Sequence, residues 1–299
     1  MVISRKTGDF LAPGVVPRRR ERTNRVDLYI VGLGIRGASQ VTKETEGVLR
    51  RCRRVFSAAV FPQMNRYLRT ICPDVIDLNF LRRQGEIRLK VYERMVEMVL
   101  EGAGESPPVA LATYGHPLVY MAPSRWLLHR APQCGLTVKM LAAVSSIDCL
   151  FVDLQLDPGP GGLQMYGANA LLLRKRPLQP DVPCLILQPG SVETGLDSMN
   201  VGSRPKRFRR LKEYLLGFYP PTHEVIVATA PSALKGLPVQ KGVTLGKLES
   251  AHTHLYQDAT LYIPPRASRP VMDRKFESLL MSKEHLQNIT APPGAGKLS

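Results

Sequence analysis

Two side chains four residues apart, Arg88 and Tyr92, form the pair in this sequence best suited to move a proton. Apolar residues recur at helical spacing over residues 85–100, and an i, i+4 pair lies on one face of a helix. A cation close to a phenol favours the phenolate and lowers its pKa from about 10. The spacing therefore predicts an acidified tyrosine. The alternative is an arginine stacked on a surface tyrosine with no chemical role.

A glycine loop follows the first apolar run, residues 26–31. Its sequence, Gly32-Leu33-Gly34-Ile35-Arg36-Gly37, matches the pattern that binds a dinucleotide pyrophosphate at the start of a helix. That function also needs an acidic residue about 20 positions later to hold the ribose, but residues 47–73 contain neither Asp nor Glu. The pattern would then fit only a site for NADP, in which Arg53 or Arg54 would bind the cofactor in place of the acidic residue. We therefore expect a glycine turn that admits a ligand or a neighbouring backbone segment.

Strand and helix patterns alternate along the chain. Apolar β-type runs at 26–31, 55–60, 109–114 and 138–141 alternate with helical spacing after Thr42, at 85–100 and at 123–130. This order is typical of a parallel sheet with crossover helices. The pattern restarts after about residue 165, with strands expected at 170–173, 183–187, 224–230 and 260–263 and a helix near 210–217. A Pro- and Gly-rich segment, 158–162, predicts a flexible insert between two α/β halves.

These patterns predict an α/β protein with two α/β lobes. We expect a flexible basic arm at 1–25, an N-terminal lobe at 26–155, a C-terminal lobe at 156–268 and a tail at 269–299.

Composition narrows the function classes. The chain has 299 residues, with 41 Lys+Arg against 25 Asp+Glu, a formal net charge of +16. Such a field attracts anions, but no aromatic residues interleave with the basic clusters, so charge alone does not predict a nucleic-acid partner. No apolar run is long enough to span a membrane.

His252 and His254 have no nearby cluster of further ligands, so we expect no metal. The cysteines, widely spaced and without a CxxC pair, are typical of free thiols in a reducing cytoplasm: Cys52, Cys72, Cys134, Cys149 and Cys184.

Several loops together carry a family resemblance. They are Val31-Gly32-Leu33-Gly34, Tyr114-Gly115-His116-Pro117-Leu118-Val119-Tyr120, Ser145–Leu154, Leu156-Asp157-Pro158 and Leu261–Pro265. Over residues 26–268 the chain resembles the tetrapyrrole-methylase superfamily. Within it, the chain is most similar to borosin-type peptide backbone α-N-methyltransferases. The resemblance implies two α/β lobes with the cofactor, S-adenosylmethionine, bound in the cleft between them and S-adenosylhomocysteine as product. It also implies a homodimer.

By position, the resemblance assigns a set of residues to the cofactor: Tyr114, Gly115, His116, Val119, Tyr120, Ser145, Ser146, Gln188, Ala230 and Thr260. Loops at the ends of strands that offer N–H, C=O and small hydroxyl groups suit such a zwitterion. Two alternatives stay open. Ser145 and Ser146 also suit a helix cap, and the alternative role of His116 is to hold its turn.

The chemistry implied by the resemblance is difficult, because an amide nitrogen shares its lone pair with the carbonyl group. Relatives of this type use a tyrosine made more acidic by an arginine, so we predict Tyr92 as base, Arg88 as its activator and Tyr114 as the positioning group. Where relatives have another tyrosine, this chain has Arg82 followed by Arg83. That change removes a hydroxyl and adds positive charge, which makes a more anionic acceptor easier to accommodate.

Three functions are compatible with these observations. The favoured one is methylation of backbone amides in a separate peptide, because the longest apolar run after Pro270 is only Leu279-Leu280-Met281. The second keeps the fold but methylates a tetrapyrrole or another small anion. The third is a catalytically weak basic adaptor that binds RNA or an acidic protein.

Overall fold

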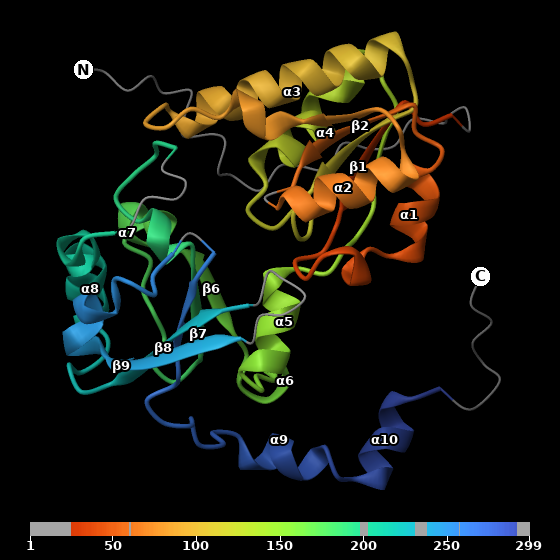
Figure 1. The fold of residues 1–299 in the computed structure, drawn as a ribbon. Coiled ribbons are helices and arrows are strands. Elements are labelled where there is room, and N and C mark those ends of the chain that lie inside the picture. The colour runs from red at the N-terminus through yellow and green to blue at the C-terminus, as the bar shows by residue number, and fades with distance from the viewer. Residues whose placement is uncertain (1–24, 60, 198–202, 231–237, 257, 292–299) are drawn as a thin grey trace.

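The chain is built around two sheets of five strands each (Figure 1). The computed structural model describes residues 25–59, 61–197, 203–230, 238–256 and 258–291. Nearly all of the expected N-terminal arm, and residues 292–299 of the expected tail, lie outside these ranges. The α/β class and the two-sheet architecture predicted from the sequence are confirmed.

The N-terminal sheet is entirely parallel, as the alternation of strands and helices predicts. Its spatial order is β3 (Val75–Asp77), β2 (Arg54–Ala58), β4 (Val109–Thr113), β1 (Leu28–Gly32) and β5 (Val138–Met140). β4, the central strand, is buried along its whole length, because helices cover both faces of a parallel sheet. Gly32 of β1 and Ala58 of β2 both pair with Thr113 of β4. The loops that follow these strands therefore leave from one edge of the sheet.

Two pairs of helices cover the two faces of this sheet (Figure 1). They are α1 (Lys43–Leu49) and α2 (Pro62–Ile71) on one face, and α3 (Arg88–Glu105) and α4 (Ala122–Gln133) on the other. Val48 and Leu68 pack with Val31 and Val55 in one cluster. A second cluster joins the inner stripe of α3 to the opposite face of the strands. Each face of the sheet is thus covered by the apolar side of amphipathic helices, with the helical spacing that the sequence predicts.

The C-terminal sheet is mixed. Its order is β6 (Gln164–Gly167), β7 (Cys184–Leu187), β10 (Thr260–Ile263), β8 (Glu224–Thr229) and β9 (Val239–Thr244). β6 and β7 are parallel, and the other neighbours are antiparallel. α7 (Ala168–Arg174) and α8 (Arg209–Leu216) pack against its core.

Two expectations in this half and one in the N-terminal half were wrong or incomplete. Residues 170–173 lie in α7 rather than in a strand, because the strand ends earlier, at Gly167. A short apolar run does not by itself distinguish a buried helix from a strand. β9 was not predicted, since most of its residues are exposed and its sequence, Val239–Thr244, is not a continuous apolar run. β3, in the N-terminal sheet, was also missed because it has only three residues.

The segment between the sheets is helical rather than a flexible insert. α5 (Ser146–Asp153) is followed by the four-residue helix α6 (Pro158–Gly161). The Asp157 carboxylate accepts a hydrogen bond from the backbone N–H of Gly159 at 2.8 Å and so caps α6. An N-cap carboxylate and a proline in the first turn allow a helix in a Gly/Pro-rich sequence.

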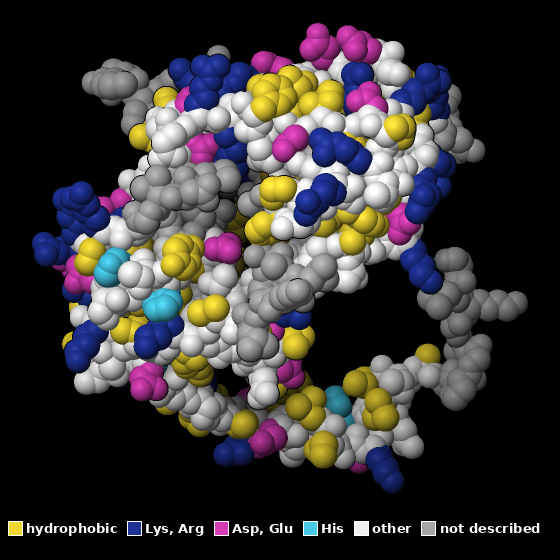
Figure 2. All heavy atoms as spheres, viewed as in Figure 1, with side chains coloured by type: hydrophobic (Ala, Val, Ile, Leu, Met, Phe, Trp, Pro, Cys, Tyr) yellow, Lys and Arg dark blue, Asp and Glu magenta, His cyan; other side chains and the backbone are white. Residues whose placement is uncertain are grey.

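Beyond the second sheet, α9 (Arg274–Leu279) and α10 (Lys283–Ile289) form an arm that extends away from both lobes (Figure 1). The sequence was not expected to form helices here. Asp273 and Ser282 cap the two helices by accepting from Phe276 N–H and His285 N–H. Figure 2 shows hydrophobic side chains along this arm. None of its residues is buried.

Among the described residues, the lobes meet in two main regions. A small cluster contains Ile35 of the glycine loop, Cys149 of α5 and Ala230 after β8, with Tyr114 packed against it. At the other end, residues 195–197 pair with residues 85–88: Asp197 N–H donates to Glu86 C=O, and Arg88 N–H donates to Gly195 C=O. The space between these two contacts contains the candidate site.

Candidate active site

A cavity of about 670 Å³ lies between the two sheets. This size is typical of small-molecule sites, which run from about 300 to 1,000 Å³. Its wall includes nine of the ten predicted cofactor residues and all three predicted catalytic residues: Tyr92, Arg88, Tyr114, Gly115, His116, Val119, Tyr120, Ser146, Gln188, Ala230 and Thr260. The cofactor residue not in the wall is Ser145.

One end of the cavity, here called the donor end, is built by backbone segments that approach each other closely. Gly115 N–H donates to Gly34 C=O at 3.0 Å. A Cβ on Gly32 would lie 2.2 Å from the Gly115 carbonyl oxygen and 2.5 Å from Ala143 Cβ. Gly34 and Gly115 both have positive φ, which favours glycine. The glycine loop therefore serves a neighbouring backbone, one of the two uses expected from the sequence.

The loop after β4 holds its shape through side chains and strained backbone. His116 Nδ1 accepts a hydrogen bond from Leu118 N–H at 3.1 Å, so the imidazole holds the turn. Tyr120 has a φ of 56°, and Gln188, across the cavity, has a φ of 53°. Left-handed non-glycine residues cost energy and cluster at functional sites. Burial raises the pKa of Tyr120 to about 12, so its hydroxyl stays protonated at neutral pH.

Ser145 is a helix cap. Its hydroxyl accepts from Ile147 N–H and Asp148 N–H, while the Asp148 carboxylate accepts from Ser145 N–H and from the Ser145 hydroxyl. This reciprocal arrangement is a capping box. The helix-cap alternative therefore applies to Ser145, because its side chain forms hydrogen bonds within α5. Ser146 is the serine that lines the cavity.

Three segments of the C-terminal sheet meet at the donor end because of strand register. Thr260 pairs with Leu187 on one side and Ala228 on the other. Gln188 and Ala230, which follow those strands, therefore lie beside Thr260 at the same edge, and all three line the cavity. Sequence positions far apart are brought together only by this pairing.

Tyr114 lies where the two lobes meet. Its ring contacts Phe61 edge-on, with ring centroids 5.6 Å apart. Burial, reinforced by the negative charge of Asp258, raises the pKa of Tyr114 well above its usual range. Its hydroxyl is therefore a neutral hydrogen-bonding group, which fits the predicted positioning role better than a role as base.

The opposite end of the cavity, here called the acceptor end, contains Tyr92. Its ring packs edge-on against Trp126 of α4, with centroids 6.4 Å apart. No hydrogen bond reaches its hydroxyl from the described residues. Burial raises the pKa of Tyr92, while the charges of Arg88 and Arg82 oppose that rise. The expected net acidification is therefore wrong for the protein without ligands, because desolvation of the phenolate exceeds the attraction of the cations.

Arg88 is placed by the start of α3. No side chain caps this helix. Instead, Arg88 N–H donates to Gly195 C=O and Arg88 Nη2 donates to Leu196 C=O, both at 3.0 Å. The C-terminal lobe thus satisfies a helix start that would otherwise lack acceptors. Arg88 and Tyr92 share one face of α3, as their spacing predicts, and both line the cavity.

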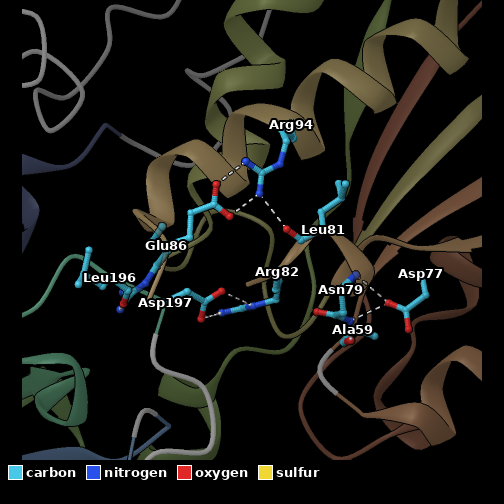
Figure 3. Close-up of polar contacts among 10 residues, drawn as sticks. Ala59, Asp77, Asn79, Leu81, Arg82, Glu86, Arg94, Leu196 and Asp197 are labelled. Atoms are coloured by element: carbon cyan, nitrogen blue, oxygen red, sulfur yellow. Dashed lines mark hydrogen bonds and ion pairs between the residues drawn. The ribbon is translucent and has the colours of Figure 1, made fainter. Parts of the chain in front are cut away.

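Arg82, which stands where relatives are expected to carry a tyrosine, does not add free positive charge. Its Nε and Nη2 atoms donate to the two carboxylate oxygens of Asp197, each at 2.9 Å (Figure 3). Asp197 comes from the C-terminal lobe and is 2% exposed. Such a bidentate pair is geometrically specific and its charges cancel. The expectation of added positive charge at residue 82 is therefore corrected.

Sequence reasoning missed several residues of the site. Asp197 gave no signal, because its partner Arg82 lies 115 positions away. Asn79 lines the cavity, and its side-chain amide donates to Ala59 C=O and to the Asp77 carboxylate (Figure 3). Asp258 lines the donor end and is two residues from the predicted Thr260. That proximity was the one available clue.

A family model described as tetrapyrrole (corrin/porphyrin) methylases matches residues 27–234. The chain belongs to this family, as the two-lobed fold and the cavity between the lobes suggested. Within the described residues, no helix is long and apolar enough to cross a membrane, and no group of three or more His, Cys, Asp or Glu side chains is placed to hold a metal ion.

Curated relatives sharpen this assignment. The chain is 30% identical over 247 residues to the methyltransferase/precursor of the cyclic peptide dendrothelin A from Dendrothele bispora, covering 82% of this chain and 59% of the relative. It is 31% identical over 267 residues to a type I borosin cyclic peptide precursor with a methyltransferase from Gymnopilus junonius, covering 88% and 63%. The chain thus spans about three fifths of the length of these relatives.

Solved structures show the same fold at lower identity. A uroporphyrin-III C-methyltransferase from Thermus thermophilus, complexed with S-adenosylhomocysteine, matches with a TM-score of 0.54 and 16% identity, over 79% of this chain and 91% of that one. A diphthine synthase matches with a TM-score of 0.53 and 13% identity, over 81% and 91%. These likenesses establish the fold.

Proposed function

We propose that this protein is an S-adenosylmethionine-dependent methyltransferase that methylates backbone amide nitrogens of a peptide. The observation that carries the proposal is the single cavity that holds both the donor-end loops and the Arg88–Tyr92 pair. About 30% identity to fungal methyltransferase/peptide precursors favours a peptide acceptor over a tetrapyrrole.

The donor end fits the cofactor. Backbone groups around Gly115, the Gln188 amide and the Thr260 hydroxyl suit ribose and adenine edges, and Asp258 offers a carboxylate to the ammonium group or to ribose hydroxyls. Bound S-adenosylmethionine supplies an electrophilic methyl group. The preorganised loop, strained at Tyr120 and Gln188, keeps these groups in position before binding.

At the acceptor end, Tyr92 takes the amide proton and Arg88 stabilises the phenolate that does so. The raised pKa makes Tyr92 a strong base once deprotonated, and Trp126 fixes the direction of its ring. Tyr114, a neutral hydroxyl between the two ends, donates to the amide oxygen. This chain has Arg82 where relatives are expected to carry a tyrosine, so the hydroxyl of that tyrosine is missing. Orientation of the amide therefore depends on Tyr114 and Asn79.

That the peptide is a separate molecule is part of the proposal. Residues 270–299 contain no apolar run longer than Leu279–Met281, so this stretch itself offers no long apolar segment for methylation. We also propose a homodimer. The side chains of Met272, Phe276, Leu280 and Met281 on the arm are 82, 55, 66 and 89% exposed, and contiguous apolar surface of this kind is usually covered by another chain. Sedimentation should give twice the monomer mass, and a monomer at micromolar concentration would contradict the dimer.

The function is tested with purified protein, donor and peptides that have a Val/Ile-rich segment. We expect mass increases of whole methyl groups, located on backbone nitrogens by fragmentation. Methylation confined to a tetrapyrrole such as uroporphyrinogen would replace the peptide proposal with the second function. Absence of S-adenosylhomocysteine binding by calorimetry, together with salt-sensitive RNA binding, would favour the adaptor instead.

A further inference from the structure

A second cavity of about 360 Å³ adjoins the acceptor end. Ser203 lines both cavities, so the two are neighbours on either side of this residue. The wall of the second cavity is formed by two short segments, and its charged members are mostly basic: Val192, Glu193, Ser203, Arg204, Lys206 and Arg207. Three of these residues, Arg204, Lys206 and Arg207, lie in one basic stretch of the sequence.

Arg207 is the fixed element of this cavity. Its Nε donates to Val192 C=O at 2.9 Å, and its Nη1 donates to the Ser203 hydroxyl at 3.0 Å. Its Nη2 is buried and has no acceptor among the described residues. A buried guanidinium nitrogen without an acceptor is costly. The side chain is thus held in one orientation with hydrogen-bonding capacity left over.

Among the described residues, no carboxylate forms an ion pair with this guanidinium. Glu193 is the acidic residue in the wall, and its carboxylate pairs with Arg210 at 2.9 Å. Burial and the positive charge of Arg88 lower the pKa of Arg207, while the negative charge of Glu193 opposes this shift. Arg88 therefore acts on Arg207 from the main cavity.

We propose that Arg207, with Arg88, forms a subsite for a carboxylate of the acceptor peptide, so that the protein selects peptides with an Asp or Glu near the methylated segment. This inference rests on the proposed function and adds the substrate class. A carboxylate accepts two N–H groups at once and satisfies the spare capacity of Arg207. Arg204 and Lys206, both exposed, would attract the acidic peptide to the cavity.

The test uses a library of acetylated, amidated octapeptides with a fixed Val-Ile-Val centre and all residue types at the flanking positions. The library is equilibrated with immobilised full-length protein saturated with S-adenosylhomocysteine, and retained peptides are sequenced. We expect Asp and Glu to be enriched about tenfold or more at one flanking position, because a charge-assisted hydrogen bond to a buried group has an effect of that size. In Arg207→Gln the enrichment should fall below about twofold.

The matched control is Arg209→Gln, on an exposed arginine of α8 that pairs with Glu249 and does not line either cavity. It should keep the acidic preference. Equal affinity for S-adenosylhomocysteine in all three proteins shows that each is folded. Retention of apolar peptides without acidic preference, or a preference that survives Arg207→Gln, would overturn the subsite while leaving the methyltransferase intact. Retention of no peptide, with none methylated, would overturn both proposals.

Discussion

The donor end and the acceptor end of the cavity are built on different principles. The donor end is made of backbone, glycines and short side chains, such as the approach of Gly32 to Gly115 and the pairing that places Thr260. The acceptor end is made of long charged side chains, including Arg88, Arg82 and Asp197. The proposed zwitterionic cofactor would need a fixed shape, whereas the proposed amide acceptor would need groups whose charge controls a proton. Changes at the two ends should therefore affect different measurements.

The largest effect is expected at the acceptor end. Tyr92→Phe removes the proposed base and should lower kcat by about 1,000-fold, within the range for loss of a general base. Donor affinity, measured by calorimetry, should stay within about twofold because Tyr92 belongs to the other end. Tyr29→Phe, on a tyrosine packed in the N-terminal core away from the cavity, is the matched control. Unchanged turnover in Tyr92→Phe would remove this residue from the mechanism.

The next effect concerns the pair that joins the lobes. Asp197→Ala leaves the Arg82 guanidinium, whose side chain is 20% exposed, without its counter-ion, and should lower the free energy of unfolding by about 3 kcal/mol. Urea denaturation measures the loss. Asp197→Asn, which keeps the shape and one acceptor, should lose less than half of this. Equal losses in both variants would show that the ion pair is not what stabilises this contact.

The charges around Tyr92 should shift the pH dependence of kcat in opposite directions. Only the phenolate can accept a proton and burial raises the pKa of Tyr92, so kcat should increase with pH beyond neutrality. Arg88→Gln removes a cation and should raise, by about one pH unit, the pH at which kcat increases. Asp197→Asn removes an anion and should lower this pH by a smaller amount. An unchanged pH dependence of kcat in Arg88→Gln would contradict activation by this arginine.

The smallest effect is expected at the donor end. Ser145→Ala removes the cap of α5 and should lower the free energy of unfolding by about 1 kcal/mol. Donor affinity should remain within a factor of about two, because the Ser145 side chain does not line the cavity. Ser146→Ala, which changes a residue of the wall without removing the cap, is the complementary variant. A tenfold loss of donor affinity in Ser145→Ala alone would restore the role first assigned to this serine.

Local signals predicted the parts of this molecule that depend on neighbours in sequence. The parallel N-terminal sheet and the face shared by Arg88 and Tyr92 follow from periodicity, and the cap at Ser145 was the alternative that its local motif offered. The loops at strand ends were also predictable, since parallel strands place their carboxyl ends at one edge. Errors fell on short or exposed segments. Residues 170–173 are apolar but helical, and β9 is a strand without an apolar face.

The sequence by itself determined the two-sheet α/β architecture, the glycine turn and the set of residues that could bind a cofactor. Only the tertiary structure decided the charge at residue 82 and the net direction of the Tyr92 pKa. Both depend on Asp197 and on burial between the lobes. Periodicity and motif spacing report interactions along a chain, whereas desolvation and ion pairing depend on what the other lobe brings within a few ångströms.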